Sequence, residues 1–488
     1  MSEDIKTRRE WSPGVRLLLV ALIGLVLAVP LMMVYAMVYD RQNQAQTAQS
    51  EINAGWGGAQ VVSGPVIVVP FRTTQTQTEE VNGKTTSRVV EVEKLLYISP
   101  VNNAVTTEIL PQERTKSIYR SVLFEAKVAG KAVFALPEDL SRFGVTRERL
   151  MWDRAELRVG ASDARGLTAG ASLGMDGKAL APQPGKGPAS SGGEGFFAFL
   201  PWDGAGEITI DYGFGLRGSR LLSLVPRGGR TQWTVKSPWA SPSFSGAFLP
   251  DQRDVKDSGF TASYTIDKLA LGMAPVAMED PGFPNIDYGV DGERVTSYKS
   301  DVAAEAAADA ASAASAAAGG ADEVIGGPAR AVTVGLVEPV NLYSKVDRAV
   351  KYGFLFIGFT FLAYFLFDIV AGARVAAAEY LLTGAGLVLF FVLLLAFAEV
   401  IGFTPAYLLA SGSIIALLTA YGAAVLKSWK RAQFMGALLV GLYALLFVLL
   451  NLEAWSLLIG SLLLFAALAG VMYATREVDW STAKKREE

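Results

Sequence analysis

The stretch YLLTGAGLVLFFVLLLAFA, residues 380–398, contains no charged side chain and lies between Glu379 and Glu399. An α-helix rises about 1.5 Å per residue, so a run of this length reaches across the hydrocarbon core of a bilayer. Short charged segments separate it from four similar apolar runs, at 352–373, 404–426, 432–452 and 454–475. The sequence therefore predicts five membrane-spanning helices in the last third of the chain.

A sixth apolar run, residues 17–39, follows a basic N-terminal segment. This run could be an uncleaved membrane anchor or a cleaved signal peptide. The signal peptide is a real alternative because Val34–Ala36 fits a small-x-small cleavage site. The run is longer than the usual apolar part of a signal peptide, so we interpret it as an uncleaved anchor. The sequence thus predicts six transmembrane helices, one N-terminal and five C-terminal.

The distribution of Lys and Arg predicts the orientation of these helices, since cytoplasmic loops are enriched in both residues. Basic residues occur in 1–16, at Arg374, in 427–431 and in the tail, whereas the turns near 399–403 and 451–453 contain none. We expect a multi-pass protein of the bacterial inner membrane with both termini in the cytoplasm. The expected parts are a cytoplasmic N-terminus (1–16), a first span (17–39), a periplasmic domain (40–349), a five-helix membrane domain (350–475) and a cytoplasmic tail (476–488).

Short runs of alternating apolar and polar residues fill most of the region between the first and second spans. Examples are 121–128, 207–212 and 260–266, and Gly and Pro interrupt the pattern repeatedly. Many short strands without long helices favour an antiparallel, β-rich, sandwich-like domain, which makes the whole chain an α+β membrane protein. We expect 181–195 to be a mobile loop and 302–320 to be an Ala-rich low-complexity insertion.

Composition restricts the chemistry that this chain can perform. It contains no Cys and no His, and its formal net charge is −3. Disulfides, thiol catalysis and the common Ser–His pairing are therefore excluded, and no basic surface for nucleic acid is indicated. We expect no cofactor and no metal site.

Three short motifs resemble catalytic signatures but lack the context that their chemistry needs. Residues 170–174 match G-x-S-x-G, yet no His is available as the base. Residues 213–218 match G-x-G-x-x-G, but the downstream acidic residue of a dinucleotide site is missing, so we expect a turn between strands. Residues 481–484 match S-x-x-K in the charged tail, where we expect no catalytic site.

Three charged residues of the membrane region are candidate functional or structural sites. Asp368 is the charge that lies well inside an apolar run, six residues before Arg374. A charge near the bilayer centre costs about 2.5–3.5 kcal/mol on insertion scales, so Asp368 either pairs, for instance with Arg374, or serves as an ion or proton site. Glu399 follows the third run directly, and we expect it to lie at the membrane interface.

Several longer segments resemble the CreD family of inner-membrane proteins, which are also called cell envelope integrity proteins. These segments are SGPVIVVP (63–70), SDARGL (162–167), SLVPRGG (223–229), SPSFSGAFLP (241–250), DRAVKYGFLFIGFTF (347–361), YLLTGAGLVLFFVLLLAFAE (380–399) and GFTPAYLLAS (402–411). The resemblance implies a Gram-negative envelope protein linked to envelope integrity, colicin tolerance and β-lactam response. It implies no enzymatic reaction and supplies no catalytic residues.

The sequence leaves three hypotheses for function. The first is a non-enzymatic envelope protein whose partners are the lipid bilayer and other envelope proteins. The second is a component of a transporter or channel that uses Asp368, and the third is a periplasmic envelope hydrolase that works without His or Cys. Within SDARGL, Asp163 and Arg165 are expected to form an ion pair in a tight turn, or else to belong to a partner-binding loop.

Overall fold

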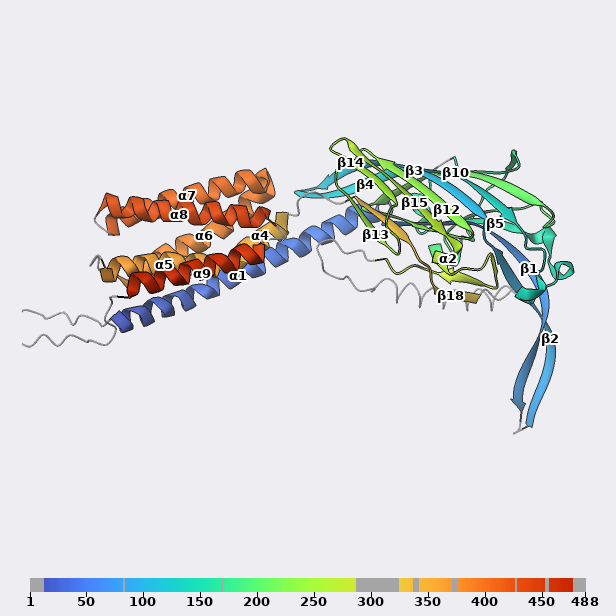
Figure 1. Ribbon diagram of the computed structural model, residues 1–488, viewed down its shortest axis with the longest axis horizontal. Helices are drawn as coiled ribbons and strands as arrows, with labels where there is room; N and C mark the ends of the chain where they lie inside the picture. The colour runs from blue at the N-terminus through green and yellow to red at the C-terminus, as the bar shows by residue number, and fades with distance from the viewer. Residues whose placement is uncertain are drawn as a thin grey trace, which may run out of the picture. The chain divides into compact units, whose positions relative to one another are not determined.

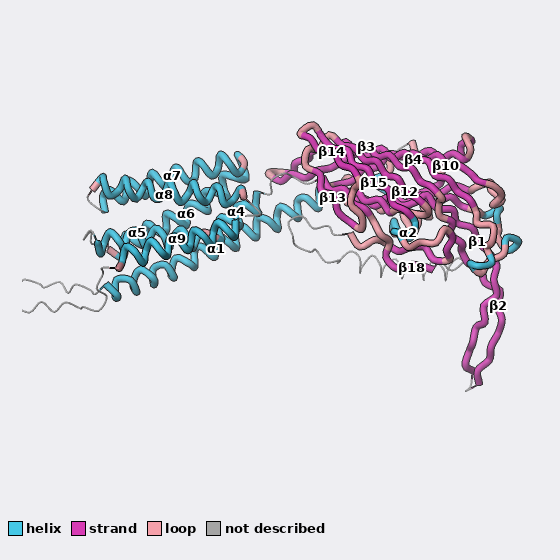
Figure 2. Tube along the Cα trace, viewed as in Figure 1, coloured by secondary structure: helices cyan, strands magenta, loops and turns pink. Residues whose placement is uncertain are grey.

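The computed structural model describes residues 13–81, 84–168, 170–286, 324–336, 342–370, 376–425, 428–452 and 456–476. The chain divides into two compact units (Figure 1), namely Met1–Thr47 with Val340–Glu488, and Ala48–Pro339. Helices build the first, which we call the helical unit, and strands dominate the second, the β unit (Figure 2). The Ala-rich segment and the S-x-x-K motif lie outside the described residues.

Helix α1 (Pro13–Ala54) is much longer than the apolar run that predicted it. It has 42 residues and continues through the polar stretch after Tyr39. Gln, Ala and Glu in that stretch are good helix formers, and the helix ends just before Gly55. Pro30 lies inside it, which membrane helices tolerate. The first part of α1 belongs to the helical unit and its last residues belong to the β unit.

The helical unit also contains one short helix, α4 (Leu342–Lys351), and a series of long ones. These are α5 (Gly353–Val370), α6 (Ala377–Ile401), α7 (Phe403–Val425), α8 (Trp429–Asn451) and α9 (Ser456–Thr475). Glycines allow close approach between them, since an added Cβ at Gly384 of α6 would lie 2.1 Å from Leu27 of α1. Aromatic rings fill the centre, where Phe390 contacts Tyr443 with ring centroids 4.6 Å apart.

The expectation of six membrane spans is not fully met. Within the described ranges, four helices are long and apolar enough to cross a membrane, namely α1, α6, α7 and α8. The second and sixth predicted runs form α5, of 18 residues, and α9, of 20 residues. The second run was predicted to begin at Tyr352, where a turn separates α5 from α4, and residues 371–375 lie outside the described residues.

Among the described residues, two large sheets face each other in the β unit. The first has the order β13 (Pro242–Gly246), β19 (Val332–Leu336), β11 (Leu221–Val225), β1 (Gln60–Val81), β5 (Glu156–Ala161), β9 (Gly195–Phe199) and β8 (Gln183–Pro184), with β2 (Lys84–Ile98) beside β1 and β16 (Val276–Ala277) beside β2. The second has the order β14 (Gln252–Lys256), β15 (Gly259–Asp267), β12 (Arg230–Ser237), β3 (Asn102–Lys116), β4 (Tyr119–Ala135), β10 (Glu207–Ser219), β6 (Ser172–Met175) and β7 (Lys178–Leu180). Strands β17 (Glu279–Gly282) and β18 (Val324–Pro328) form a small separate pair.

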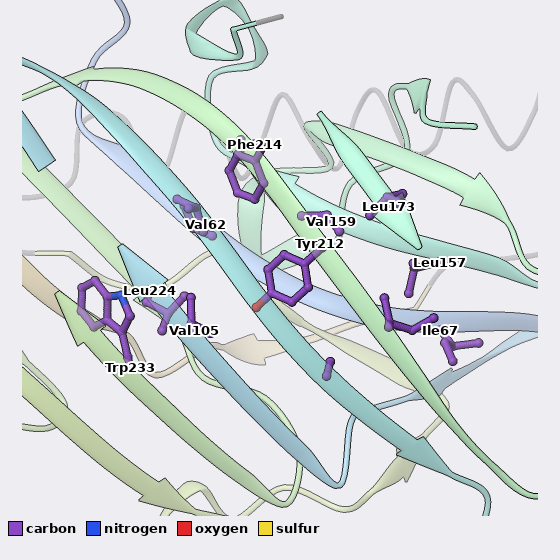
Figure 3. Packing of buried hydrophobic residues seen from close by; sticks show 14 of the residues in the cluster. Val62, Ile67, Val105, Leu157, Val159, Leu173, Tyr212, Phe214, Leu224 and Trp233 are labelled. Carbon is purple, nitrogen blue, oxygen red and sulfur yellow. The ribbon is translucent and has the colours of Figure 1, made fainter. Parts of the chain in front are cut away.

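The sandwich-like expectation is confirmed, because side chains from both sheets form one core (Figure 3). Trp233 of β12 stacks on Tyr264 of β15, and its indole N–H donates to the Thr107 hydroxyl at 2.9 Å. The alternation of buried and exposed residues along β12 is regular, as a strand with one buried face requires. Most described strand pairs are antiparallel, as expected, but β1 pairs with β11, and β3 with β12, in parallel.

Two local expectations are corrected by the β unit. The segment predicted to be a mobile loop contains the fully buried Ser190 and Ser191, within a short 3₁₀ turn at Ala189–Ser191. The G-x-G-x-x-G motif is not a turn but lies within strand β10. Its glycines make room for neighbours, since an added Cβ at Gly215 would lie 2.0 Å from the Thr168 hydroxyl oxygen.

Candidate functional site

Glu399 joins three helices at one end of the helical unit. It lies in the last turn of α6, and its side chain is only 12 % exposed. Tyr343 of α4 donates its hydroxyl to the Glu399 carboxylate at 3.2 Å, and the Arg41 guanidinium of α1 lies 3.9 Å away. A carboxylate in such a setting is stabilised because it keeps both a hydrogen bond and a counter-charge. Glu399 is therefore part of a paired cluster rather than an isolated interfacial charge.

The short helix α4 supplies most of the other contacts at this end of the unit. Val346, Ala349 and Val350 are buried, which gives the helix one apolar face. On its polar side, the Lys345 ammonium donates to the Asn451 side chain of α8 at 3.1 Å and lies 5.3 Å from the centre of the Phe403 ring. Helix α4 thus connects the ends of α6, α7 and α8, as an amphipathic helix at an interface can.

The two other candidate residues of the membrane region cannot be assigned a contact. Asp368 lies near the end of α5, and its backbone is helical. Its side chain is not described, and Arg374 lies outside the described residues. Their pairing stays a prediction.

Asp163 and Arg165 form an ion pair in the β unit. Arg165 donates Nε and Nη2 to the two carboxylate oxygens of Asp163, at 2.9 and 2.8 Å, and its backbone N–H donates to the same carboxylate at 3.1 Å. These Arg165 hydrogen bonds lower the pKa of Asp163 below its ordinary value. The contact closes the 3₁₀ turn Ala164–Gly166, which fits the structural alternative of the two proposed from sequence.

A buried polar network that sequence reasoning missed lies on the first sheet of the β unit. The guanidinium of Arg227 pairs with the carboxylate of Asp280 on β17, and their side chains are 1 % and 0 % exposed. Arg227 also donates to the hydroxyls of Ser190, at 3.0 Å, and Ser63, at 3.3 Å. The second carboxylate oxygen of Asp280 accepts the backbone N–H of Ala189 at 2.5 Å. Four chain segments are thereby held together.

The sequence contained only part of the signal for this network. Ser63 and Arg227 both occur in segments that carry the family resemblance. They are 164 residues apart, however, and nothing in either segment indicates that the two side chains meet. No sequence pattern around Asp280 or Ser190 predicted that they take part in a buried network. Charged pairs that are buried this deeply are costly to desolvate, so each partner requires the other.

The described surface of the β unit also contains one open cleft, of about 470 Å³, at the end of the sandwich. Glu138, Arg147 and Glu148 contribute its charged lining. The Ser141 hydroxyl beside it donates to Asp139, which is a contact within one local turn. Within the described residues no group of three or more Asp or Glu side chains could hold a metal ion.

Replacing Arg227 with Met should strongly destabilise the β unit, because it leaves the Asp280 carboxylate buried without a counter-charge. The expected loss is about 3–5 kcal/mol of unfolding free energy, measured by denaturant unfolding of the full chain in detergent. Arg230→Met is the matched control, since Arg230 pairs with Asp267 and both side chains are more than half exposed. The control should cost much less, because water and salt screen an exposed pair. Equal losses in the two variants would contradict the importance of the buried pair.

Glu399→Gln and Tyr343→Phe should lose the same interaction in the helical unit. A hydrogen bond to a charged acceptor contributes about 1.5–3 kcal/mol, and partial exposure reduces the expected coupling between the two positions to about 1 kcal/mol. A double-mutant cycle on the thermal unfolding of the solubilised chain measures this coupling. Purely additive effects would show that the contact does not stabilise the helical unit.

Comparison with known proteins agrees with this architecture. The family model described as "Inner membrane protein CreD" matches residues 12–481. The chain is 29 % identical over 462 residues to inner membrane protein CreD of Escherichia coli strain K12, covering 93 % of this chain and 91 % of that one.

Two solved structures share little with the chain. A variant of an M1 zinc metallopeptidase from Deinococcus radiodurans with a bound Tyr-Ser-Ala substrate is 10 % identical, covers 69 % of this chain and 92 % of its own, and gives a TM-score of 0.22. The M1 zinc metallopeptidase from the same organism is 9 % identical, covers 70 % of this chain and 93 % of its own, and gives a TM-score of 0.20. Scores this low support no inference. With a match over nearly its whole length, the chain belongs to the CreD family of inner membrane proteins.

Proposed function

We propose that this protein is a non-enzymatic inner-membrane protein that presents its β unit on the periplasmic side and supports envelope integrity through contacts with envelope components. Its family is one of inner membrane proteins and is not a known enzyme family. By family resemblance, the envelope role extends to stress response, colicin tolerance and the response to β-lactams.

The continuity of α1 is the observation that carries this proposal. The helix packs in the helical unit through residues such as Leu27 and Leu31. Near its other end, in the β unit, Gln49 donates to the Arg120 carbonyl at 2.8 Å and Asn53 accepts the Ser121 hydroxyl at 2.7 Å. A single unbroken helix that is anchored by side-chain contacts in both units suits a protein that displays a folded domain from a membrane.

The periplasmic placement can be tested with single cysteines, because the chain contains none of its own. Leu249→Cys, at an exposed position of the β unit, should react with a membrane-impermeant maleimide added to intact spheroplasts. Ser481→Cys, in the charged tail, should react only after permeabilisation, since segments with Lys and Arg beside a membrane span stay in the cytoplasm. The opposite pattern would reverse the proposed topology.

A transporter or channel component is the second candidate, and one feature of the helical unit favours it. The hydroxyl groups of Thr360 and Tyr364 on α5 and of Thr383 on α6 are buried inside the helical unit. Asp368 follows Tyr364 by four residues on α5, which is about one helical turn. Polar groups inside a membrane bundle often mark an ion or proton path.

Asp368→Asn separates the two candidates. If the protein acts only through contacts of its β unit with envelope components, the variant changes neither those contacts nor the packing of the chain. Cells that carry it should then tolerate detergent and β-lactam as well as cells with the original chain. Protein level and cysteine accessibility are measured in parallel. Loss of tolerance at a normal protein level and with normal topology would refute the first candidate. It would support an ion or proton path that uses the Asp368 carboxylate.

A further inference from the structure

The β unit carries a two-stranded ribbon that extends beyond both sheets, formed by residues 72–81 of β1 and 84–93 of β2 (Figure 1). From Gln60 to Val68, β1 lies between other strands, and Phe71 forms a last isolated bridge to Leu150. Beyond Phe71, the described strands offer β1 no partner except β2. At about 3.3 Å per residue, residues 72–81 of β1 span roughly 33 Å. Over this length one edge of the strand is free.

The free edge of β1 differs from the edges of both main sheets. The end strands described there are protected in the usual ways against pairing with another chain. Strand β14 has Arg253, Asp254 and Lys256 among its five residues, and β7 has only three residues. Strand β13 begins with Pro242, and β8 consists of Gln183 and Pro184. Charge, shortness or proline thus limits pairing at each of them.

The central part of the β1 ribbon edge, between Arg72 and Glu79, has none of these protections. Residues 73–78 read TTQTQT, with no charge, no Gly and no Pro. Thr74, Gln75 and Thr76 are exposed. The opposite strand is different, since the ribbon part of β2 carries Arg88 and Glu91. An isolated two-stranded ribbon is only marginally stable in water, so a further strand on this edge would stabilise it.

We propose that this edge of β1, at residues 73–78, pairs antiparallel with the same edge of a second copy of the chain. The edge is complementary to itself, because an uncharged stretch meets no like charge when two copies run antiparallel. Thr and Gln side chains can then hydrogen-bond across the pair. Confinement of both copies to one membrane raises their effective concentration, so that a short edge suffices. The product is a four-stranded sheet shared by two chains.

Disulfide crosslinking in membranes tests the pairing, and the absence of native cysteines makes each introduced one unique. Thr74→Cys, Gln75→Cys and Thr76→Cys are made separately in the full chain and oxidised, and dimer is read at twice 52.0 kDa on a non-reducing gel. One of the three should give about fivefold more dimer than Val89→Cys, the residue opposite Thr76 on β2, because that position lies one strand farther from the partner.

A charge at the edge supplies the second arm of the experiment. A lysine at one of the two remaining positions among Thr74, Gln75 and Thr76, added to the best crosslinking variant, should reduce the dimer about fivefold, because two lysines then approach across the pair. Thr234→Lys, at an exposed position in the middle of β12, is the matched control and should leave the dimer unchanged. Dimer no greater from the β1 positions than from Val89→Cys overturns the proposal. So does a crosslinked product whose mass shows a different protein on this edge.

Discussion

The hydrocarbon core of a bilayer offers the backbone no hydrogen-bond partner, and the helical unit follows from this constraint. Every long segment there satisfies its own N–H and C=O groups as an α-helix, and glycines such as Gly384 let neighbouring helices approach. Charged side chains gather where the helices end. At one end of the unit Glu399 lies beside Arg41, and Lys345 of α4 bonds to Asn451 at the end of α8. The constraint therefore determines both the form of the helices and the place of their polar contacts.

A different problem arises in the β unit, which has no disulfide to hold it because the chain has no Cys. Its stability comes from burial between the two sheets, where Trp233 and Tyr264 stack, and from satisfied polar groups. The Arg227–Asp280 pair is the most deeply buried of its ion pairs in the described residues. By engaging Ser63 and Ser190 as well, the pair fixes the 3₁₀ turn at Ala189–Ser191 and strand β17 against the first sheet. A segment rich in Pro, Gly and Ser is thus ordered by a few specific contacts.

These features agree with a protein that works by presenting surfaces. The cysteine- and histidine-free composition leaves few routes to catalysis, and the Ser–Asp contact beside the open cleft belongs to a local turn. Of the edges that the two sheets expose, most are short, charged or contain Pro, as in proteins that avoid accidental pairing. The ribbon of β1 and β2 is the exception, and its uncharged edge is where the β unit is best suited to bind another extended chain.

The membrane character, the β-rich domain between the first two apolar runs and the family could all be predicted from the sequence, because they depend on composition, period and long ordered motifs. The sequence also indicated the Asp163–Arg165 contact, since the two residues are neighbours in one turn. It misjudged what depends on distant segments. The motif 213–218 lies within β10, and 181–195 is partly buried. Only the tertiary structure brought Arg227 to Asp280 and left the β1 edge open, because strand order and register arise from pairing between residues far apart in the chain.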